Sequence, residues 1–257
     1  MIFDITWNIA LLLFGAGILG GVINAVAGGA TLFTFPAMMA AGLSPIAANA
    51  SSSVALTPGN LSGVLSEKSQ LPAFDATMWL HIAVAAVGGG IGAVLLLWTP
   101  DKVFTALVPL LIGVATLIFA FSKQIQAALR PADQAHHDTP VARQVALAPT
   151  AIYGGYFGAG MGVMFMAAFS MTSPWAVRTA NAVKNLLGAA VNWTAIIIFV
   201  VQGVIAWPQT LIMLVGATIG GFLGGKLLGI VPVIWIRRFV IAMGALMTLI
   251  YAYRYWL

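Results

Sequence analysis

Apolar stretches of membrane-spanning length recur along this chain, and they constrain its fold more than any other feature. Three of them cover residues 78–98, 103–121 and 204–228. Each is long enough to cross about 30 Å of hydrocarbon as a helix, which takes about 20 residues. Of the 257 residues, 61% are hydrophobic and 7% are charged, whereas soluble domains carry about 25% charged residues. A water-soluble fold would leave much of this apolar surface exposed, so we expect many membrane crossings.

The composition of these stretches predicts helices. They are rich in Leu, Ile, Ala and Gly, and they lack the period-two alternation of barrel strands, which expose one face to lipid and the other to the lumen. Lys and Arg lie mainly between the apolar stretches, so the net charge of +5 reports membrane topology and not nucleic-acid binding. The absence of Cys excludes thiolate metal sites and Cys nucleophiles. The sequence therefore predicts an all-α, polytopic integral membrane protein in a lipid bilayer, without a cofactor or a metal.

The two halves of the chain resemble each other at an offset of 132 residues, and the alignment needs no gap between residues 48 and 121. Such self-similarity over a long stretch indicates duplication of one ancestral unit. The matched residues include Ala48-Asn49-Ala50 with Ala180-Asn181-Ala182, Asn60 with Asn192, Gly88 with Gly220, Gly92 with Gly224, and Pro100 with Pro232.

Each half is expected to contain about five segments. A glycine-interrupted pair (residues 6–42 and 145–172) comes first, and three helices follow it near 45–66, 76–98 and 102–122, and again near 174–201, 207–230 and 233–254. The second pair has only 28 residues, about 42 Å of helix, so we expect half-helices or re-entrant hairpins at the start of each repeat. The predicted division is a first membrane repeat at 1–122, a polar connecting loop at 123–144 that includes His136 and His137, and a second membrane repeat at 145–257.

The distribution of basic residues predicts the orientation. If each glycine-interrupted pair returns to its starting side, each half crosses the membrane an odd number of times and the two repeats have inverted topology. Most Lys and Arg residues then lie on one face, as the positive-inside rule requires. We therefore expect a multi-pass protein of the bacterial inner membrane with a cytoplasmic loop at 123–144 and periplasmic termini. Because Asp4 is the only charge before the first apolar segment, we interpret that segment as a membrane helix and not as a signal peptide.

Polar side chains follow one helix in each half. The first of these helices is expected to begin with Ser44 as N-cap and Pro45 as its first residue. Unpaired amides and hydroxyls are costly in hydrocarbon, so these residues either pack against other helices or line a polar cavity. Lys184 lies ten residues, about 15 Å, into its helix, and an intramembrane cation suggests a functional site. The candidate substrate-binding residues on the two helices are Asn49, Ser52, Ser53, Thr57, Asn60, Asn181, Lys184, Asn185 and Asn192.

Glycines interrupt the segment that opens each half. A broken helix there would present free backbone N–H groups at a half-helix N-terminus, which attracts anions. All six acidic residues lie at segment ends or in loops, so we expect no buried carboxylate proton relay, and the donors of the site suit a small anionic substrate. The candidate binding residues of the two breaks are Gly28, Gly29 and Thr31, and Gly160 and Gly162. We interpret Gly17, Gly21, Gly88, Gly92, Gly220 and Gly224 as small residues that allow close helix packing.

Three motifs together resemble a known family. They are the glycine-rich segment from Gly28-Gly29 to Phe35-Pro36, the Ser44-Pro45 start that leads into Ala-Asn-Ala-Ser-Ser-Ser, and the return of this pattern from Ser173-Pro174 to Asn185. The chain resembles the TauE/SafE sulfite exporters, also called toluene sulfonate uptake permeases, over nearly its whole length. Members are bacterial permeases associated with sulfite, sulfoacetate and related organosulfur compounds.

The resemblance implies a permease that exports sulfite or an organosulfonate such as sulfoacetate by alternating access. Inverted-repeat transporters bind their substrate near the bilayer midplane, between the repeats. An anion channel, or an importer that uses the same site, is the alternative. The sequence leaves open whether the chain acts alone or as a homo-oligomer. We expect no enzymatic activity, because nothing supplies an oxyanion hole for a Ser62–His81 pair.

Overall fold

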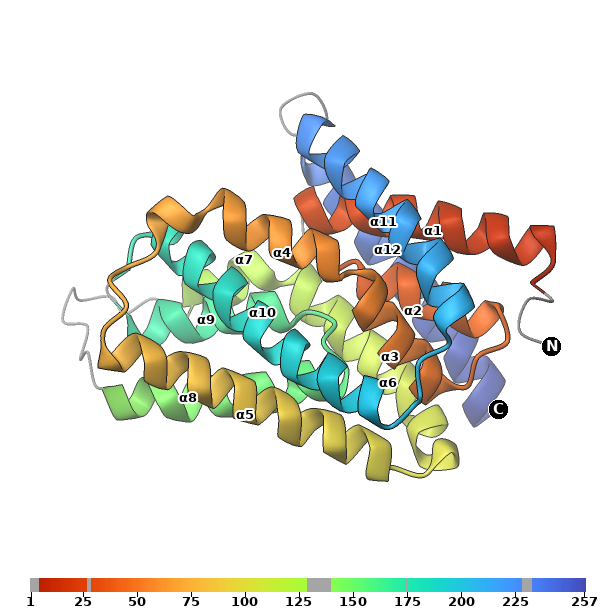
Figure 1. The fold of residues 1–257 in the computed structure, drawn as a ribbon, viewed down its shortest axis with the longest axis horizontal. Helices are drawn as coiled ribbons and strands as arrows, with labels where there is room; N and C mark the ends of the chain where they lie inside the picture. The colour runs from red at the N-terminus through yellow and green to blue at the C-terminus, as the bar shows by residue number, and fades with distance from the viewer. Residues whose placement is uncertain (1–4, 27–28, 129–139, 174, 228–232) are drawn as a thin grey trace.

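The computed structural model describes residues 5–26, 29–128, 140–173, 175–227 and 233–257, and helices make up most of each range (Figure 1). No strand occurs in these ranges, so the prediction of an all-α fold is confirmed. The helices are α1 (Trp7–Val26), α2 (Thr31–Ala40), α3 (Pro45–Ala55), α4 (Thr57–Ser66), the 3-10 helix η1 (Lys68–Gln70), α5 (Ala76–Trp98), α6 (Asp101–Ala120), α7 (Ser122–Ala128), α8 (Pro140–Tyr156), α9 (Met161–Thr172), α10 (Val177–Val201), α11 (Trp207–Leu227) and α12 (Val233–Trp256).

Six of the described helices are long and apolar enough to cross a membrane. They are α1, α5, α6, α10, α11 and α12, and each contains an apolar window of 18 residues with few charges. Helices α2 and α9 are apolar but shorter, with 10 and 12 residues. At 1.5 Å per residue these two reach about 15–18 Å, roughly half of the hydrocarbon thickness.

The polar helix of the first half begins as predicted but is divided in two. Ser44 caps α3, because its hydroxyl accepts a hydrogen bond from the Ala47 amide at 3.4 Å, and Pro45 is the first helical residue. The predicted single helix at 45–66 is interrupted at Leu56, where α3 ends and α4 begins. Pro58 has no N–H to donate to the carbonyl of Val54, which accounts for the interruption at this point.

The glycine-interrupted pairs are less symmetric than predicted. Helix α1 has 20 residues and is a full-length candidate span, so only α2 is short in the first pair. The chain turns between them at Gly29, whose φ of +86° favours glycine. In the second pair, α8 has 17 residues and begins at Pro140, before the predicted start at 145, and α9 follows Gly160, whose φ is +80°. Gly28, His136 and His137 lie outside the described residues.

The predicted connecting loop at 123–144 contains ordered helix at both ends. Helix α7 occupies its start, and the first turn of α8 occupies its end. Arg143 in that turn is only 4% exposed, and its Nε and Nη2 donate to the Thr172 carbonyl oxygen at 3.3 and 3.0 Å. Its guanidinium also lies 4.9 Å from the centre of a Trp175 ring. Arg143 therefore joins the start of α8 to the end of α9 and is not part of an exposed loop.

Glycines bring two pairs of helices into backbone contact. Helix α1 packs along α11, and α5 packs along α8. A Cβ atom at Gly21 would lie 2.2 Å from the carbonyl oxygen of Ala217, and one at Gly92 would lie 2.0 Å from that of Ile152. No side chain fits at such distances, so the predicted role of these glycines in close helix packing is confirmed.

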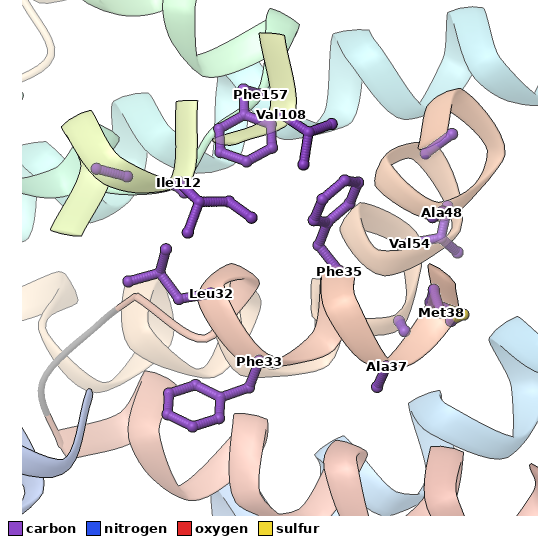
Figure 2. Packing of buried hydrophobic residues seen from close by; sticks show 14 of the residues in the cluster. Leu32, Phe33, Phe35, Ala37, Met38, Ala48, Val54, Val108, Ile112 and Phe157 are labelled. Atoms are coloured by element: carbon purple, nitrogen blue, oxygen red, sulfur yellow. The ribbon is translucent and has the colours of Figure 1, made fainter. Parts of the chain in front are cut away.

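Helix α2 lies inside the protein. Its residues from Leu32 to Met38 are all buried, and it packs against α1, α3, α6 and α12. Figure 2 shows Phe35 pointing toward Val108 and Phe157, with Phe33 on the opposite side of the helix. The Phe35 and Phe157 rings meet edge to face with centroids 5.5 Å apart. Packing on both sides fixes this half-length helix within the bundle.

Candidate functional site

Lys184 belongs to a cluster of four polar side chains between α10 and the end of α4. Its Nζ donates to Asn181 Oδ1 at 2.6 Å, and Asn181 Nδ2 donates to Glu67 Oε1 at 2.6 Å. Asn185 Nδ2 donates to Glu67 Oε2 at 2.9 Å. All four side chains are half-buried. An ammonium, two amides and a carboxylate thus form one continuous network.

Helix geometry explains why these groups meet. Asn181, Lys184 and Asn185 are three and four residues apart on α10, so they share one face of that helix. Glu67 is the C-cap residue of α4, which packs against α10. Asn185 Nδ2 also donates to the carbonyl oxygen of Gly63 on α4 at 3.4 Å.

The aliphatic part of Lys184 lies against the start of α9. A Cβ atom at Gly162 would be 3.4 Å from Lys184 Cδ. Gly162 is in the first turn of α9, where backbone N–H groups lack partners within the helix. The structure therefore brings Lys184 and Gly162 together, two residues that the sequence placed in one anion site. Gly160, the N-cap residue, lies nearer to α6, with its Cβ position 3.6 Å from the Ala115 carbonyl oxygen.

The cluster contains a carboxylate that was not among the predicted site residues. Glu67 stands at the end of a segment, as the sequence indicated, yet its side chain turns toward α10 and accepts hydrogen bonds from both asparagines. Asn60 lies seven residues before Glu67, about two helical turns, yet it meets Asn24 of α1, so spacing along the chain does not indicate that Glu67 meets α10. Position at a segment end does not keep a side chain out of a neighbouring site.

The polar residues of α3 mostly contact other helices or their own backbone. Asn49 is 1% exposed, and its Nδ2 donates to the Tyr156 carbonyl oxygen at 3.1 Å, while its Oδ1 is buried without a hydrogen-bond partner among the described residues. Ser52 shares a hydrogen bond of 2.5 Å with Thr34 of α2. Ser53 and Thr57 each donate to the carbonyl oxygen four residues earlier, at Asn49 and Ser53. In this group, Asn49 Oδ1 is thus a buried polar atom left without a partner among the described residues.

The remaining candidates are spread over the protein. Asn60 Oδ1 accepts from Asn24 Nδ2 of α1 at 3.1 Å, which joins α4 to α1. Asn192 on α10 and Thr31 at the start of α2 are half-buried. At Gly29, a Cβ would lie 3.5 Å from the Phe119 ring of α6. In the described structure, the hydrogen bonds of the candidate residues thus form separate groups, and only the group around Lys184 contains opposite charges.

His81 belongs to a different buried cluster. It is 0% exposed, its Nδ1 contacts the Thr77 carbonyl oxygen, and its Nε2 lies 3.5 Å from Arg143 Nη1. These contacts tie the start of α5 to α8 and serve packing. The side chain of Ser62 lies outside the described residues. Where side chains are described, no group of three or more His, Cys, Asp or Glu residues would hold a metal ion.

Comparison with known proteins identifies the family. A family model described as sulfite exporter TauE/SafE matches residues 13–251, nearly the whole chain. The chain belongs to the TauE/SafE family. The matched residues include both helices that carry the Lys184 cluster and both glycine breaks, so the family assignment covers the candidate site.

Curated relatives of this TauE/SafE protein are named as membrane transporters. It is 29% identical over 215 residues to the probable membrane transporter protein YfcA of Escherichia coli K12, which covers 84% of this chain and 79% of YfcA. It is 28% identical over 232 residues to the probable membrane transporter protein ORF9 of Sinorhizobium sp, covering 87% and 84% of the two chains. It is 25% identical over 246 residues to a probable membrane transporter protein of Haemophilus influenzae, covering 95% of each. No solved structure matches this chain. With its six candidate spans, this family member is an integral membrane transporter.

Proposed function

We propose that this TauE/SafE protein is a permease for small anions, sulfite or organosulfonates such as sulfoacetate, and that it exports them by alternating access. The observation that carries the proposal is the half-buried ammonium of Lys184 beside the amides of Asn181 and Asn185 on a membrane-spanning helix. A cation inside a transporter that belongs to this family marks the place where an anion would be stabilised.

The chemistry of the cluster suits an oxyanion. A lysine ammonium has three N–H donors and each asparagine amide has two, so this face of α10 offers several donors to one group of oxygens. The adjoining N-terminus of α9 adds the positive end of a helix dipole and, at Gly162, a backbone N–H in its first turn. Charge-assisted hydrogen bonds of this kind are stronger than those between neutral groups. Of the candidate residues, Asn181, Lys184, Asn185 and Gly162 form the centre of the proposed site.

The other candidate residues are proposed to line the path on the side of the first half. Asn49 has an open Oδ1, and Ser53, Thr57 and Asn60 continue its face of the helix. Asn192 would stand in the second half where Asn60 stands in the first. The proposed wider binding set therefore comprises Asn49, Ser52, Ser53, Thr57, Asn60, Asn192, Gly28, Gly29, Thr31 and Gly160.

Alternating access requires two units that move against each other, and we propose that these are inverted repeats. Helix contacts support this. In the internal repeat, α8 corresponds to α1 and α5 corresponds to α11; α1 packs on α11, and α8 packs on α5. Single glycines show the same correspondence, because Gly21 approaches Gly221 and Gly155 approaches Gly89. These pairs correspond under the internal repeat, which is what a two-fold relation between the halves would produce.

The orientation of the proposed exporter follows from its charges. Helix α1 begins and α12 ends at one end of the molecule, at the right of Figure 1, and α7 ends and α8 begins at the other. We propose that the latter end, at the basic loop 123–144, faces the cytoplasm of a bacterial cell and that the termini face the periplasm. A negative cell interior then favours the exit of an anion by about 2.3 kcal/mol per charge for each 100 mV.

Flux measurements in proteoliposomes test this function. We expect saturable efflux of sulfite or a short sulfonate that responds to an imposed potential and is lost in Lys184→Ala. The matched control is Lys102→Ala, which removes an exposed lysine at the start of α6 and should keep its flux. Flux that does not saturate would indicate a channel. Equal flux in wild type and Lys184→Ala would return Lys184 to a structural role.

A further inference from the structure

The carboxylate of Glu67 occupies the hydrogen-bond donors that the proposed function assigns to the substrate. We infer that Glu67 is a built-in anion that fills the substrate position of the empty transporter and competes with the substrate for Asn181, Asn185 and Lys184. This inference rests on the proposed function and adds to it the residue that holds the site between transport cycles.

The geometry of the cluster is that of a bound oxyanion. Each Glu67 oxygen accepts from a different asparagine, Oε1 from Asn181 at 2.6 Å and Oε2 from Asn185 at 2.9 Å. Sulfite and sulfonate groups present oxygens of the same kind to the same donors. Lys184 is tied into the arrangement through its hydrogen bond to Asn181 Oδ1. A substrate anion that takes these amides must therefore take them from Glu67.

The charges around Glu67 make the competition selective for anions. Of the described side chains on elements packed against α4 and η1, the charged ones are Lys184, Arg178 and Lys68. Arg178 and Lys68 are exposed. Helices α1 and α3 carry no charged residue, and the side chain of Lys226 on α11 lies outside the described residues. The network therefore joins one carboxylate to one ammonium. A second anion beside the Glu67 carboxylate would meet repulsion, so binding requires that Glu67 withdraws.

The position of Glu67 allows it to withdraw. It is the C-cap of α4, where the α-helix ends and η1 begins, and all three residues of η1 are exposed. Movement of this residue needs no change within a helix that spans the membrane. In the empty transporter the carboxylate balances the charge of Lys184, and in the loaded transporter the substrate does so.

Binding to the purified full-length protein tests this competition. The probe is radiolabelled ethanesulfonate, which carries its single negative charge at neutral pH. Glu67→Gln keeps the size of the side chain and removes its charge, so we expect it to bind the probe about tenfold more tightly than wild type. In wild type, the sites that Glu67 occupies cannot bind the probe, and this lowers the apparent affinity. Asp101→Asn, which neutralises an exposed acid at the start of α6, is the matched control and should bind like wild type.

The direction of the change separates competition from a merely structural role. Loss of a merely structural hydrogen bond in Glu67→Gln would weaken binding of the probe or leave it unchanged, whereas loss of a competing anion strengthens it. If Glu67→Gln does not fold, Glu67→Asp retracts the carboxylate from both amides and should likewise bind more tightly. Equal or weaker binding in the variant that folds would overturn the inference. The proposed permease function would still stand if sulfite flux persists. Absence of both anion binding and flux in wild type would overturn the proposed function and the inference with it.

Discussion

The contact between α1 and α11 leads to a prediction that can be worked out at two neighbouring residues. A Cβ atom at Gly220 would lie 2.0 Å from the Ile18 carbonyl oxygen, whereas a Cβ atom at Gly221 would have no contact within 4 Å among the described residues. Ordinary contact begins at 3.4 Å, so Gly220→Ala forces the two backbones to separate by more than 1 Å. Overpacking of this kind costs about 1–3 kcal/mol.

The pair of variants isolates the packing cost. Both substitutions gain the same helix propensity, about 1 kcal/mol for Ala over Gly. Gly221→Ala should therefore be neutral or stabilising, and Gly220→Ala should be less stable than Gly221→Ala by about 1–3 kcal/mol. Thermal unfolding in detergent would show this as a midpoint lower by about 5 °C. If the two variants unfold at the same temperature, α1 and α11 are not in backbone contact and the packing described here is wrong.

Two further substitutions test single hydrogen bonds by the same unfolding assay. The Ala206 amide donates to Ser51 Oγ at 3.0 Å, so Ser51→Ala leaves this amide without its partner and should lower the free energy of unfolding by about 1–3 kcal/mol. Ser53→Ala removes only a hydrogen bond within α3 and should be close to neutral. Equal effects of the two would argue against the contact between α3 and the start of α11. Arg143→Met removes the charged donors of the Thr172 carbonyl and should lower stability by about 2–3 kcal/mol; an unchanged midpoint would show that the buried arginine does not hold α8 to α9.

The long helices and some of their boundaries could be predicted from the sequence, because they depend on residues close together in the chain. Apolar length predicts the spans, and a Ser-Pro pair predicts the start of α3 at Pro45. Glycines at small-xxx-small spacing predicted close packing, and Gly21 and Gly92 do face neighbouring backbones. The division at Leu56 also has a local cause, because Pro58 has no N–H for the Val54 carbonyl, although a single helix was predicted at 45–66.

The composition of the site could be predicted only in part. Lys184, Asn181 and Asn185 stand out as polar residues in an apolar helix, whereas their partner Glu67 is 114 to 118 residues away in the chain. Which polar residue of α4 meets α10, and which meets α1, depends on how the helices are packed and not on spacing along α4. For the same reason Asn60 and Ser52, which share a helical stripe with Asn49, contact α1 and α2.

An experimental structure with a bound sulfonate would test the central claim, that Lys184 and its two asparagines bind the transported anion. Soaking or co-purification with 2-bromoethanesulfonate gives a ligand whose bromine can be located independently. We predict a sulfonate oxygen within about 3 Å of Lys184 Nζ, with Glu67 displaced from Asn181 and Asn185. A sulfonate bound elsewhere in the membrane region, with the Glu67 carboxylate still held by both amides, would contradict the account.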